Sequence, residues 1–374
     1  MIWQRVYVKL VLTVGLSFGA FTPTTVYFPD PNNINGVIPA YLDGPAPSIQ
    51  ATDNSSITFH LVTRKSRIPQ QIFAYDIASI TNSSFIPKAS LKILSHGFGG
   101  EYTDWFPMDM TKVLLDLDED INIILIDWKK LATSPWYTIA APATKLVGVT
   151  AANLLKFLMQ EGLVTIDNIH IIGHSLGSHV AGNIGHELEG KCPRVTALDP
   201  ALPLFDITTD ENRIDPSDGK FVEVIHTGSG HLHENGLAFL STRGHADFYP
   251  NRGMHQPGCE SETFGTCSHA RAPKYYTESI VNKENFYACS CGHFDLFLAG
   301  KCDCSNRIYF GLSSPSTARG KYFFLTQEKS PYGMGLNGLV NFGNPSSDSG
   351  ADLPNFRIFL MLSTVIMYNL FLKL

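Results

Sequence analysis

The chain has no excess of basic residues and little charge overall. Its 374 residues include 28 Lys and Arg against 34 Asp and Glu, a formal net charge of −6, and charged residues make up 17% of the sequence. Without a basic field there is no electrostatic footprint for nucleic acid, so we exclude nucleic acid as a partner. A hydrophobic content of 44% also excludes a disordered chain and indicates a globular protein with a substantial core.

The N-terminal apolar run is too short for an ordinary membrane span. Arg5 and Lys9 precede Leu10–Ala20, which is apolar and ends in small residues. A basic region, a short apolar region and small residues are the layout of a secretory signal peptide, predicted here over residues 1–20 with cleavage near its end. A membrane anchor is the alternative, which the length of the run disfavours.

The C-terminal end carries a second apolar run, Ile358–Leu374. A polar linker, residues 341–357, precedes it and contains the small residues Ser346–Ala351. Small residues, a polar spacer and a terminal hydrophobic tail are typical of a GPI-anchor signal. A tail-end transmembrane helix and a buried amphipathic helix are the alternatives.

Cysteine is scarce outside one segment. Six of the seven cysteines lie between Cys259 and Cys304, a pattern that fits local disulfides in a secreted protein. Asn54 and Asn82 begin Asn-Ser-Ser sequons, which are glycosylation acceptors if the chain enters the secretory pathway. We therefore predict a secreted or surface-anchored glycoprotein.

The chain shows no internal repeat. Residues 21–47 are rich in Pro, Gly and Asn and are predicted to be a surface arm or a propeptide, ahead of a single domain over residues 48–340. In that domain short apolar runs alternate with a helical pattern at 146–160, which predicts a mainly parallel sheet. The expected strands are 91–94, 121–127, 169–172, 195–198 and 221–225.

The pentapeptide Gly-His-Ser-Leu-Gly at 173–177 is the most informative motif. It lies between the predicted strand 169–172 and a run of small residues with helical character. That context is the one in which Gly-x-Ser-x-Gly forms a nucleophile elbow. Its glycines allow a strained turn that exposes the serine hydroxyl at a helix N-terminus. We predict Ser175 as a catalytic nucleophile.

A nucleophilic serine needs a base and an acid. Asp199 follows the strand after the elbow, so it shares the carboxyl edge of the sheet with Ser175, as in an α/β hydrolase. The alternative is that Asp199-Pro200 only begins a turn. Spacing alone does not choose the base, because many histidines follow Asp199 in the chain: His226, His231, His233, His245, His255, His269 and His293.

An oxyanion hole requires two backbone N–H groups near the serine. One is expected from Leu176, the residue after the nucleophile. The other is expected from the glycine-containing segment 96–99, which follows the strand 91–94, with Phe98 as the donor. The alternative for this segment is a plain glycine turn.

Six motifs in order along residues 50–340 resemble the signature series of the pancreatic lipase family. They are Ser95-His96-Gly97-Phe98, Asp127-Trp128, the pentapeptide at 173–177, Leu198-Asp199-Pro200-Ala201, Gly244-His245-Ala246-Asp247-Phe248-Tyr249-Pro250 and Cys267-Ser268-His269-Ala270-Arg271. The resemblance implies an α/β-hydrolase fold with Ser175 as nucleophile, Asp199 as acid and His269 as base. It also implies that His245 is structural.

The segment 210–218 resembles the calcium loop of that family. Asp215 and Asp218 match its carboxylate ligands, while Asp210 and Arg213 match positions that supply backbone carbonyls. Clustered oxygen ligands suit Ca²⁺, so a structural calcium ion is expected; no other cofactor is required. Asp210 stands where the family usually has glutamate. The alternative is a solvated acidic turn.

The resemblance also implies how the cysteines pair. Cys259 and Cys267 correspond to the pair that closes the family's lid, and only seven residues lie between them. Two further pairs are expected, Cys291 with Cys302 and, outside it, Cys289 with Cys304, which leaves Cys192 free or intermolecular. So short a lid implies a less covered site and is typical of the family's phospholipase A1 members. After residues 332–335, no β-sandwich domain is expected.

These observations predict a serine ester hydrolase acting on lipid. The first hypothesis is a phospholipase A1 that releases the sn-1 fatty acid through an acyl-serine intermediate. The second is a triacylglycerol or neutral-lipid lipase, and the third is a non-catalytic lipid-binding relative, which would lack triad residues. The expected partner is a phospholipid or other acyl lipid at an interface. The sequence does not indicate an oligomeric state.

Overall fold

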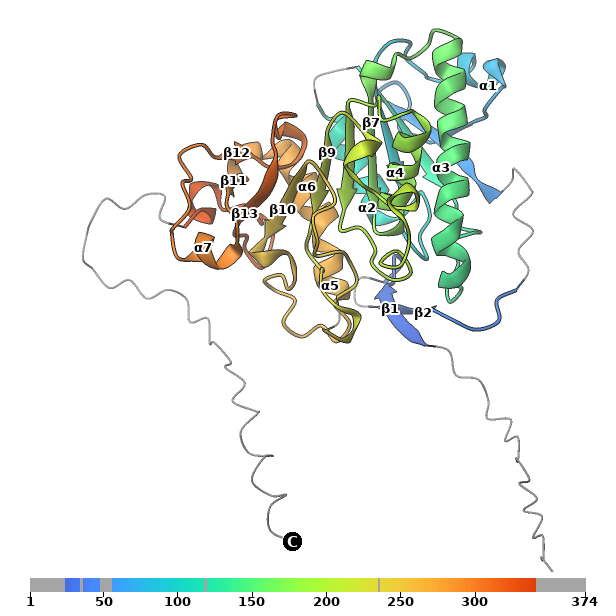
Figure 1. Cartoon of the computed structure of the whole chain (residues 1–374). Coiled ribbons are helices and arrows are strands. Elements are labelled where there is room, and N and C mark those ends of the chain that lie inside the picture. The colour runs from blue at the N-terminus through green and yellow to red at the C-terminus, as the bar shows by residue number, and fades with distance from the viewer. Residues whose placement is uncertain (1–23, 34–35, 48–55, 118–119, 235, 341–374) are drawn as a thin grey trace, which may run out of the picture. The chain divides into compact units, whose positions relative to one another are not determined.

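The protein is described by a computed structural model over residues 24–33, 36–47, 56–117, 120–234 and 236–340 (Figure 1). The predicted signal peptide, polar linker, hydrophobic tail and Asn54 sequon lie outside these residues. The Asn82 sequon lies within them, at the end of α1, and its side chain is exposed, so it is accessible for glycosylation.

A large mixed sheet forms the centre of the described chain. Its strand order is β12-β11-β13-β10-β9-β8-β7-β5-β6-β3-β4, and the run from β13 to β6 is parallel throughout. The antiparallel pairs lie at the two edges. The strands are β3 (Thr58–Thr63), β4 (Gln70–Ile72), β5 (Ser90–Ser95), β6 (Ile121–Asp127), β7 (Ile169–His174), β8 (Arg194–Leu198), β9 (Val222–Ile225), β10 (Ala246–Pro250), β11 (Tyr287–Ser290), β12 (Ile308–Tyr309) and β13 (Gly320–Phe324).

Helices cover both faces of this sheet. The helices are α1 (Ile77–Thr81), α2 (Trp105–Leu115), α3 (Tyr137–Gln160), α4 (Leu176–Glu187), α5 (Thr266–His269), α6 (Arg271–Val281) and α7 (Phe294–Leu298). Alternate residues of β6 show the two layers, because Ile124 and Ile126 pack into the core with α3 and α4, while Ile123 and Leu125 pack into the core with α2 and α6. Coverage on both faces explains why every residue of β6 and β7 is buried. The predicted α/β-hydrolase architecture is confirmed.

The predicted central strands agree with β5 to β9 to within two residues at each end. The helix predicted at 146–160 begins earlier, at Tyr137, and continues through Pro142. Proline normally interrupts a helix, which is why the helical pattern suggests a later start. By length and composition α3 is also apolar enough to cross a membrane. Its buried face packs against α4 and the sheet in the principal core, as expected for a core helix.

The segment predicted as a surface arm forms a β-hairpin. Strands β1 (Thr25–Pro29) and β2 (Val37–Tyr41) pair antiparallel in a separate two-stranded sheet. Figure 1 shows this hairpin next to α5, at the lower edge of the domain. Phe28 and Ala40 are 1% and 0% exposed, so the hairpin belongs to the core. The sequence did not predict this burial, because the apolar partners of these residues are distant in sequence.

All three expected disulfides are present, linking Cys259 to Cys267, Cys289 to Cys304 and Cys291 to Cys302. They fit an oxidising, extracytosolic environment. Cys192 is free and fully buried, and burial raises the pKa of its thiol to about 12. An intermolecular disulfide through Cys192 is therefore excluded in the folded chain, since its sulfur has no access to a partner.

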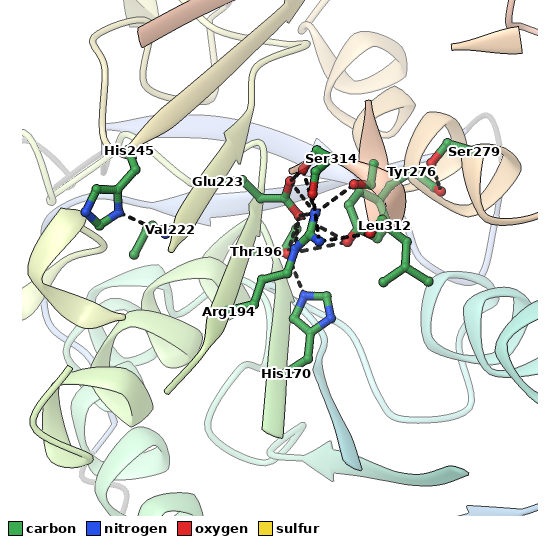
Figure 2. Close-up of polar contacts among 11 residues, drawn as sticks. His170, Arg194, Thr196, Val222, Glu223, His245, Tyr276, Ser279, Leu312 and Ser314 are labelled. Carbon is green, nitrogen blue, oxygen red and sulfur yellow. Dashed lines mark hydrogen bonds and ion pairs between the residues drawn. The ribbon is translucent and has the colours of Figure 1, made fainter. Parts of the chain in front are cut away.

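A buried ion pair joins the amino ends of β8 and β9. The Arg194 guanidinium donates to both carboxylate oxygens of Glu223 at 2.8 Å, and the Glu223 side chain is completely buried (Figure 2). Arg194 also donates to the carbonyls of Gly311 and Leu312, while Tyr276 Oη donates to Glu223 at 3.1 Å. The pair thus fastens α6 and the turn η8 (Gly311–Ser313) to the sheet.

Removing one member of this pair is predicted to destabilise the fold strongly. Glu223→Ala leaves the Arg194 charge without its partner, which typically costs about 3–5 kcal/mol. We expect that loss in the free energy of unfolding measured by urea denaturation. Glu189→Ala, which removes the exposed partner of Lys191, is the control and should leave stability unchanged. An equally small effect of both substitutions would contradict the importance of the buried pair.

Candidate active site

The turn after β7 holds Ser175 in a strained conformation. Its φ and ψ are 58° and −122°, and it forms the N-cap of α4. Few non-glycine residues adopt such a φ, and strain of this kind is typical of functional positions. The first turn of α4 lies very close to the end of β5: a Cβ on Gly177 would come within 2.2 Å of the Ser95 carbonyl oxygen. A glycine is therefore required there, and the predicted elbow geometry is present.

Asp199 lies at the carboxyl end of β8, beside the elbow. It is fully buried, and the backbone N–H groups of Thr227 and Gly228 donate to its two carboxylate oxygens at 2.7 and 2.9 Å. These bonds stabilise the ionised carboxylate and fix its orientation. His269, on α5, donates from Nδ1 to Asp199 Oδ2 at 2.6 Å. Sequence spacing did not decide which histidine after Asp199 is the base. In the structure, His269 is the one that pairs with Asp199.

Ser175 Oγ and His269 Nε2 line the same pocket and are both buried. Neither atom has a hydrogen-bond partner among the described residues. In a neutral imidazole that donates from Nδ1 to Asp199, the lone pair lies on Nε2, which is the arrangement that a general base requires. In enzymes without bound substrate, the hydrogen bond between a catalytic serine and its histidine is often long or poorly aligned. Buried polar atoms without partners are costly, so this pair marks a site built for a reacting molecule.

Other histidines in the neighbourhood have structural partners. The His226 ring lies 2.9 Å from the Asp247 carboxylate, and it also contacts the Phe239 carbonyl. His245 Nδ1 accepts a hydrogen bond from the Val222 N–H at 3.0 Å, at the amino end of β9 (Figure 2). This contact agrees with the structural position expected for His245.

His174 contributes to the site in a way that the sequence did not reveal. Burial holds the pKa of its imidazole well below the usual value, so the ring is neutral. Its Nε2 lies 3.2 Å from the His269 carbonyl oxygen, and the two imidazole centroids are 4.8 Å apart. A neutral ring that donates to this carbonyl fixes the backbone of His269. The available sequence signal was the position of His174 between Gly173 and Ser175. Its partner His269 was not evident, because it lies 95 residues further along the chain.

The segment after β5 lies directly against the serine. A Cβ on Gly97 would come within 2.8 Å of Ser175 Cβ, so the backbone that carries Phe98 is adjacent to the nucleophile. His96 fixes this segment, because its Nε2 accepts from the Trp128 N–H and the Trp128 indole donates to the His96 carbonyl, both at 3.1 Å. Leu176 is the first residue of α4, where backbone N–H groups lack helical partners. Phe98 and Leu176, the residues expected to carry the oxyanion donors, thus lie near Ser175 in the fold, and Phe98 lines the same pocket.

Comparison with known proteins agrees with this arrangement. The family model described as Lipase matches residues 45–332, most of the chain. The chain belongs to the pancreatic lipase family. It is 37% identical over 261 residues to pancreatic triacylglycerol lipase of Mus musculus and 36% identical over 261 residues to that of Homo sapiens; each alignment covers 65% of this chain and 56% of the relative. Pancreatic lipase-related protein 2 of Mus musculus is 37% identical over 62% of this chain and 52% of its own length. The chain thus spans little more than half the length of these lipases.

The site is covered in this structure although the loop between Cys259 and Cys267 is short. Ser175 is 3% exposed and His269 is fully buried. The cover comes from the hairpin, because Phe28, Pro29 and Pro31 line the pocket. Among the described residues, no side chain between Cys259 and Cys267 lines it.

The residues expected to bind calcium lie in and near the turn η4 (Pro216–Asp218). Asp218 is 2% exposed, and burial together with the neighbouring Asp215 raises the pKa of its carboxyl to about 8. Arg213 and Arg243 form ion pairs with Asp210 rather than with these two carboxylates. Asp215 and Asp218 are both buried, and two adjacent buried carboxyl groups form an oxygen-rich donor set that a divalent cation fits.

Substitution of the triad is predicted to abolish hydrolysis of a soluble ester. Ser175→Ala removes the nucleophile and His269→Ala removes the base, and each should lower kcat by roughly 10⁴- to 10⁶-fold, as in other serine hydrolases. Release of p-nitrophenol from p-nitrophenyl butyrate measures the effect. His293→Ala replaces an exposed histidine and should retain wild-type turnover. Substantial turnover by either triad variant would refute the assignment.

Proposed function

We propose that the chain is a carboxylic ester hydrolase that acts through a Ser175–His269–Asp199 triad. The observation that carries this proposal is the pair of buried, unpartnered atoms, Ser175 Oγ and His269 Nε2, in one pocket beside an anchored Asp199. Its lipase-family membership supports the same reaction class.

The geometry supports a two-step acyl transfer. Ser175 Oγ attacks the ester carbonyl while His269 Nε2 takes the serine proton, and Asp199 stabilises the imidazolium that forms. The N–H groups of Phe98 and Leu176 stabilise the developing oxyanion. His269 then protonates the departing alkoxide, which leaves an acyl group on Ser175. A water molecule deprotonated by His269 releases the fatty acid and restores the serine.

We infer that the substrate is an acyl lipid. The pocket walls beside Ser175 are apolar and include Trp105, Phe106 and Pro107, as an aliphatic chain requires. Sn-1 phospholipid hydrolysis is the first candidate, supported by the seven-residue loop between Cys259 and Cys267. Triacylglycerol hydrolysis is the second, supported by relatives named pancreatic triacylglycerol lipase and by the covered serine. Three disulfides and the predicted signal peptide support action outside the cell.

The two substrates are distinguished by one assay. Mixed vesicles carrying phosphatidylcholine with different sn-1 and sn-2 acyl chains, and emulsified triolein, are each incubated with the full chain and with Ser175→Ala. We expect the wild type to release the sn-1 fatty acid from phosphatidylcholine faster than oleate from triolein.

A higher rate on triolein would favour the second candidate. Hydrolysis of neither lipid, together with no labelling of Ser175 by an organophosphonate, would favour the non-catalytic lipid-binding alternative. Because that alternative predicts binding without turnover, vesicle co-sedimentation measured in parallel separates it from an inactive preparation.

We propose that Asp215 and Asp218, with the carbonyls of Asp210 and Arg213, hold a structural calcium ion. The buried Asp218 and its acidic neighbour support this, since a divalent cation would offset their repulsion. The turn also contacts α4 through Asp218, so a bound ion would stabilise the helix that begins at Ser175.

Calcium is predicted to raise the thermal stability of the protein. A ligand at a hundredfold excess over its Kd stabilises the folded state by about 2.7 kcal/mol, which raises Tm by several degrees in a domain of this size. We expect that shift between EDTA and CaCl₂ in scanning calorimetry. Asp218→Asn, which still accepts the Asp215 N–H bond, should lose the shift, whereas the exposed Asp167→Asn should keep it. A wild-type Tm indifferent to calcium would exclude the site.

A further inference from the structure

The hairpin β1–β2 places an aromatic ring directly over the catalytic residues. The Phe28 ring lies edge-on to the His269 imidazole, with centroids 5.8 Å apart, and it is 5.6 Å from the ring of Phe98. It is also stacked 5.2 Å from Tyr137, at the start of α3. Phe28 therefore contacts both the proposed base and the residue that carries the oxyanion donor. No part of the triad mechanism requires a phenyl ring at this position.

The hairpin is held in place along its second strand, β2. The Tyr41 N–H donates to the Pro135 carbonyl at 2.8 Å, and Ser134 Oγ donates to the Pro39 carbonyl at 2.7 Å. Ile38 on β2 approaches the segment after β5 so closely that a Cβ on Gly99 would be 2.1 Å from its Cδ1. Together with the complete burial of Ala40, these contacts make the hairpin a fixed wall rather than a loosely attached flap.

The short disulfide-closed loop supports this wall from outside. Tyr27, next to Phe28 on β1, contacts Phe264 with ring centroids 4.4 Å apart. Because successive side chains of a strand point to opposite faces, Tyr27 faces the loop while Phe28 faces the pocket. The loop thus packs against the outer face of the hairpin, and the inner face of the hairpin covers Ser175.

An acyl chain attached to Ser175 would have to extend along this wall. Trp105, Phe106 and Pro107 at the start of α2 line the same pocket, so Phe28 and these residues together bound an apolar space beside the serine. We propose that Phe28 is a specificity-determining residue whose ring limits the length of the acyl chain accepted next to Ser175. This inference rests on the proposed ester hydrolysis.

The test is the dependence of hydrolysis on acyl-chain length. We compare kcat/KM for p-nitrophenyl butyrate and decanoate, both kept below their aggregation concentrations, in wild type, Phe28→Ala and Phe28→Leu. Removing the ring opens space for the longer chain, and a methylene group in an apolar pocket changes kcat/KM by roughly 10- to 200-fold. We expect Phe28→Ala to raise the decanoate-to-butyrate ratio at least tenfold and Phe28→Leu to raise it less.

Phe73→Ala is the matched control, because Phe73 is 49% exposed and lines no part of the pocket. It should leave the ratio unchanged. An unchanged ratio in folded, active Phe28→Ala would overturn the inference, as would an equal loss on both esters, which would assign Phe28 to the support of Phe98. If Phe28→Ala does not fold by circular dichroism, the ratio for Phe28→Leu decides. Absence of turnover by wild type on both esters would instead refute the proposed function.

Discussion

The close contact between the first turn of α4 and the end of β5 is the constraint on which the site depends. Gly177 and the Ser95 carbonyl lie so close that no side chain fits between them. The turn that makes this approach contains Ser175 at a positive φ, and the backbone of Gly97, next to Phe98, lies directly against Ser175. The proposed nucleophile and the two residues proposed to supply the oxyanion donors are therefore brought together by one backbone arrangement.

The two ends of the parallel strands differ in whether their buried polar groups have hydrogen-bond partners. At the carboxyl ends of β5, β7 and β8, polar atoms of Ser175 and His269 are left without partners. At the amino ends of β8 and β9, Arg194 and Glu223 are surrounded by hydrogen bonds from neighbouring elements. A buried network whose polar groups are all hydrogen-bonded holds the strands together. Polar groups that lack hydrogen-bond partners are available to bind a substrate.

Local sequence patterns were sufficient for much of this arrangement. Ser175 and Asp199 follow apolar strands, and parallel strands bring such positions to one edge, so both residues were identifiable from the order of elements. His269 was not, because it reaches Asp199 from a helix 70 residues further along the chain, and only the family resemblance selected it. Phe28 was missed altogether. Its segment is rich in residues typical of loops, and its burial comes entirely from distant aromatic rings.

The Phe28–His269 contact has a consequence for how the protein matures. Phe28 lies near the start of the described chain and His269 is 241 residues further along (269 − 28), so this part of the pocket is completed only after most of the domain has been synthesised. Contacts between such distant segments are slow to form, because the entropy of the intervening chain must first be lost. During synthesis the hairpin can already dock on Phe98, Ser134 and Tyr137, but the pocket stays incomplete until His269 has been added. One wall of the proposed acyl pocket can therefore form well before the imidazole that completes it.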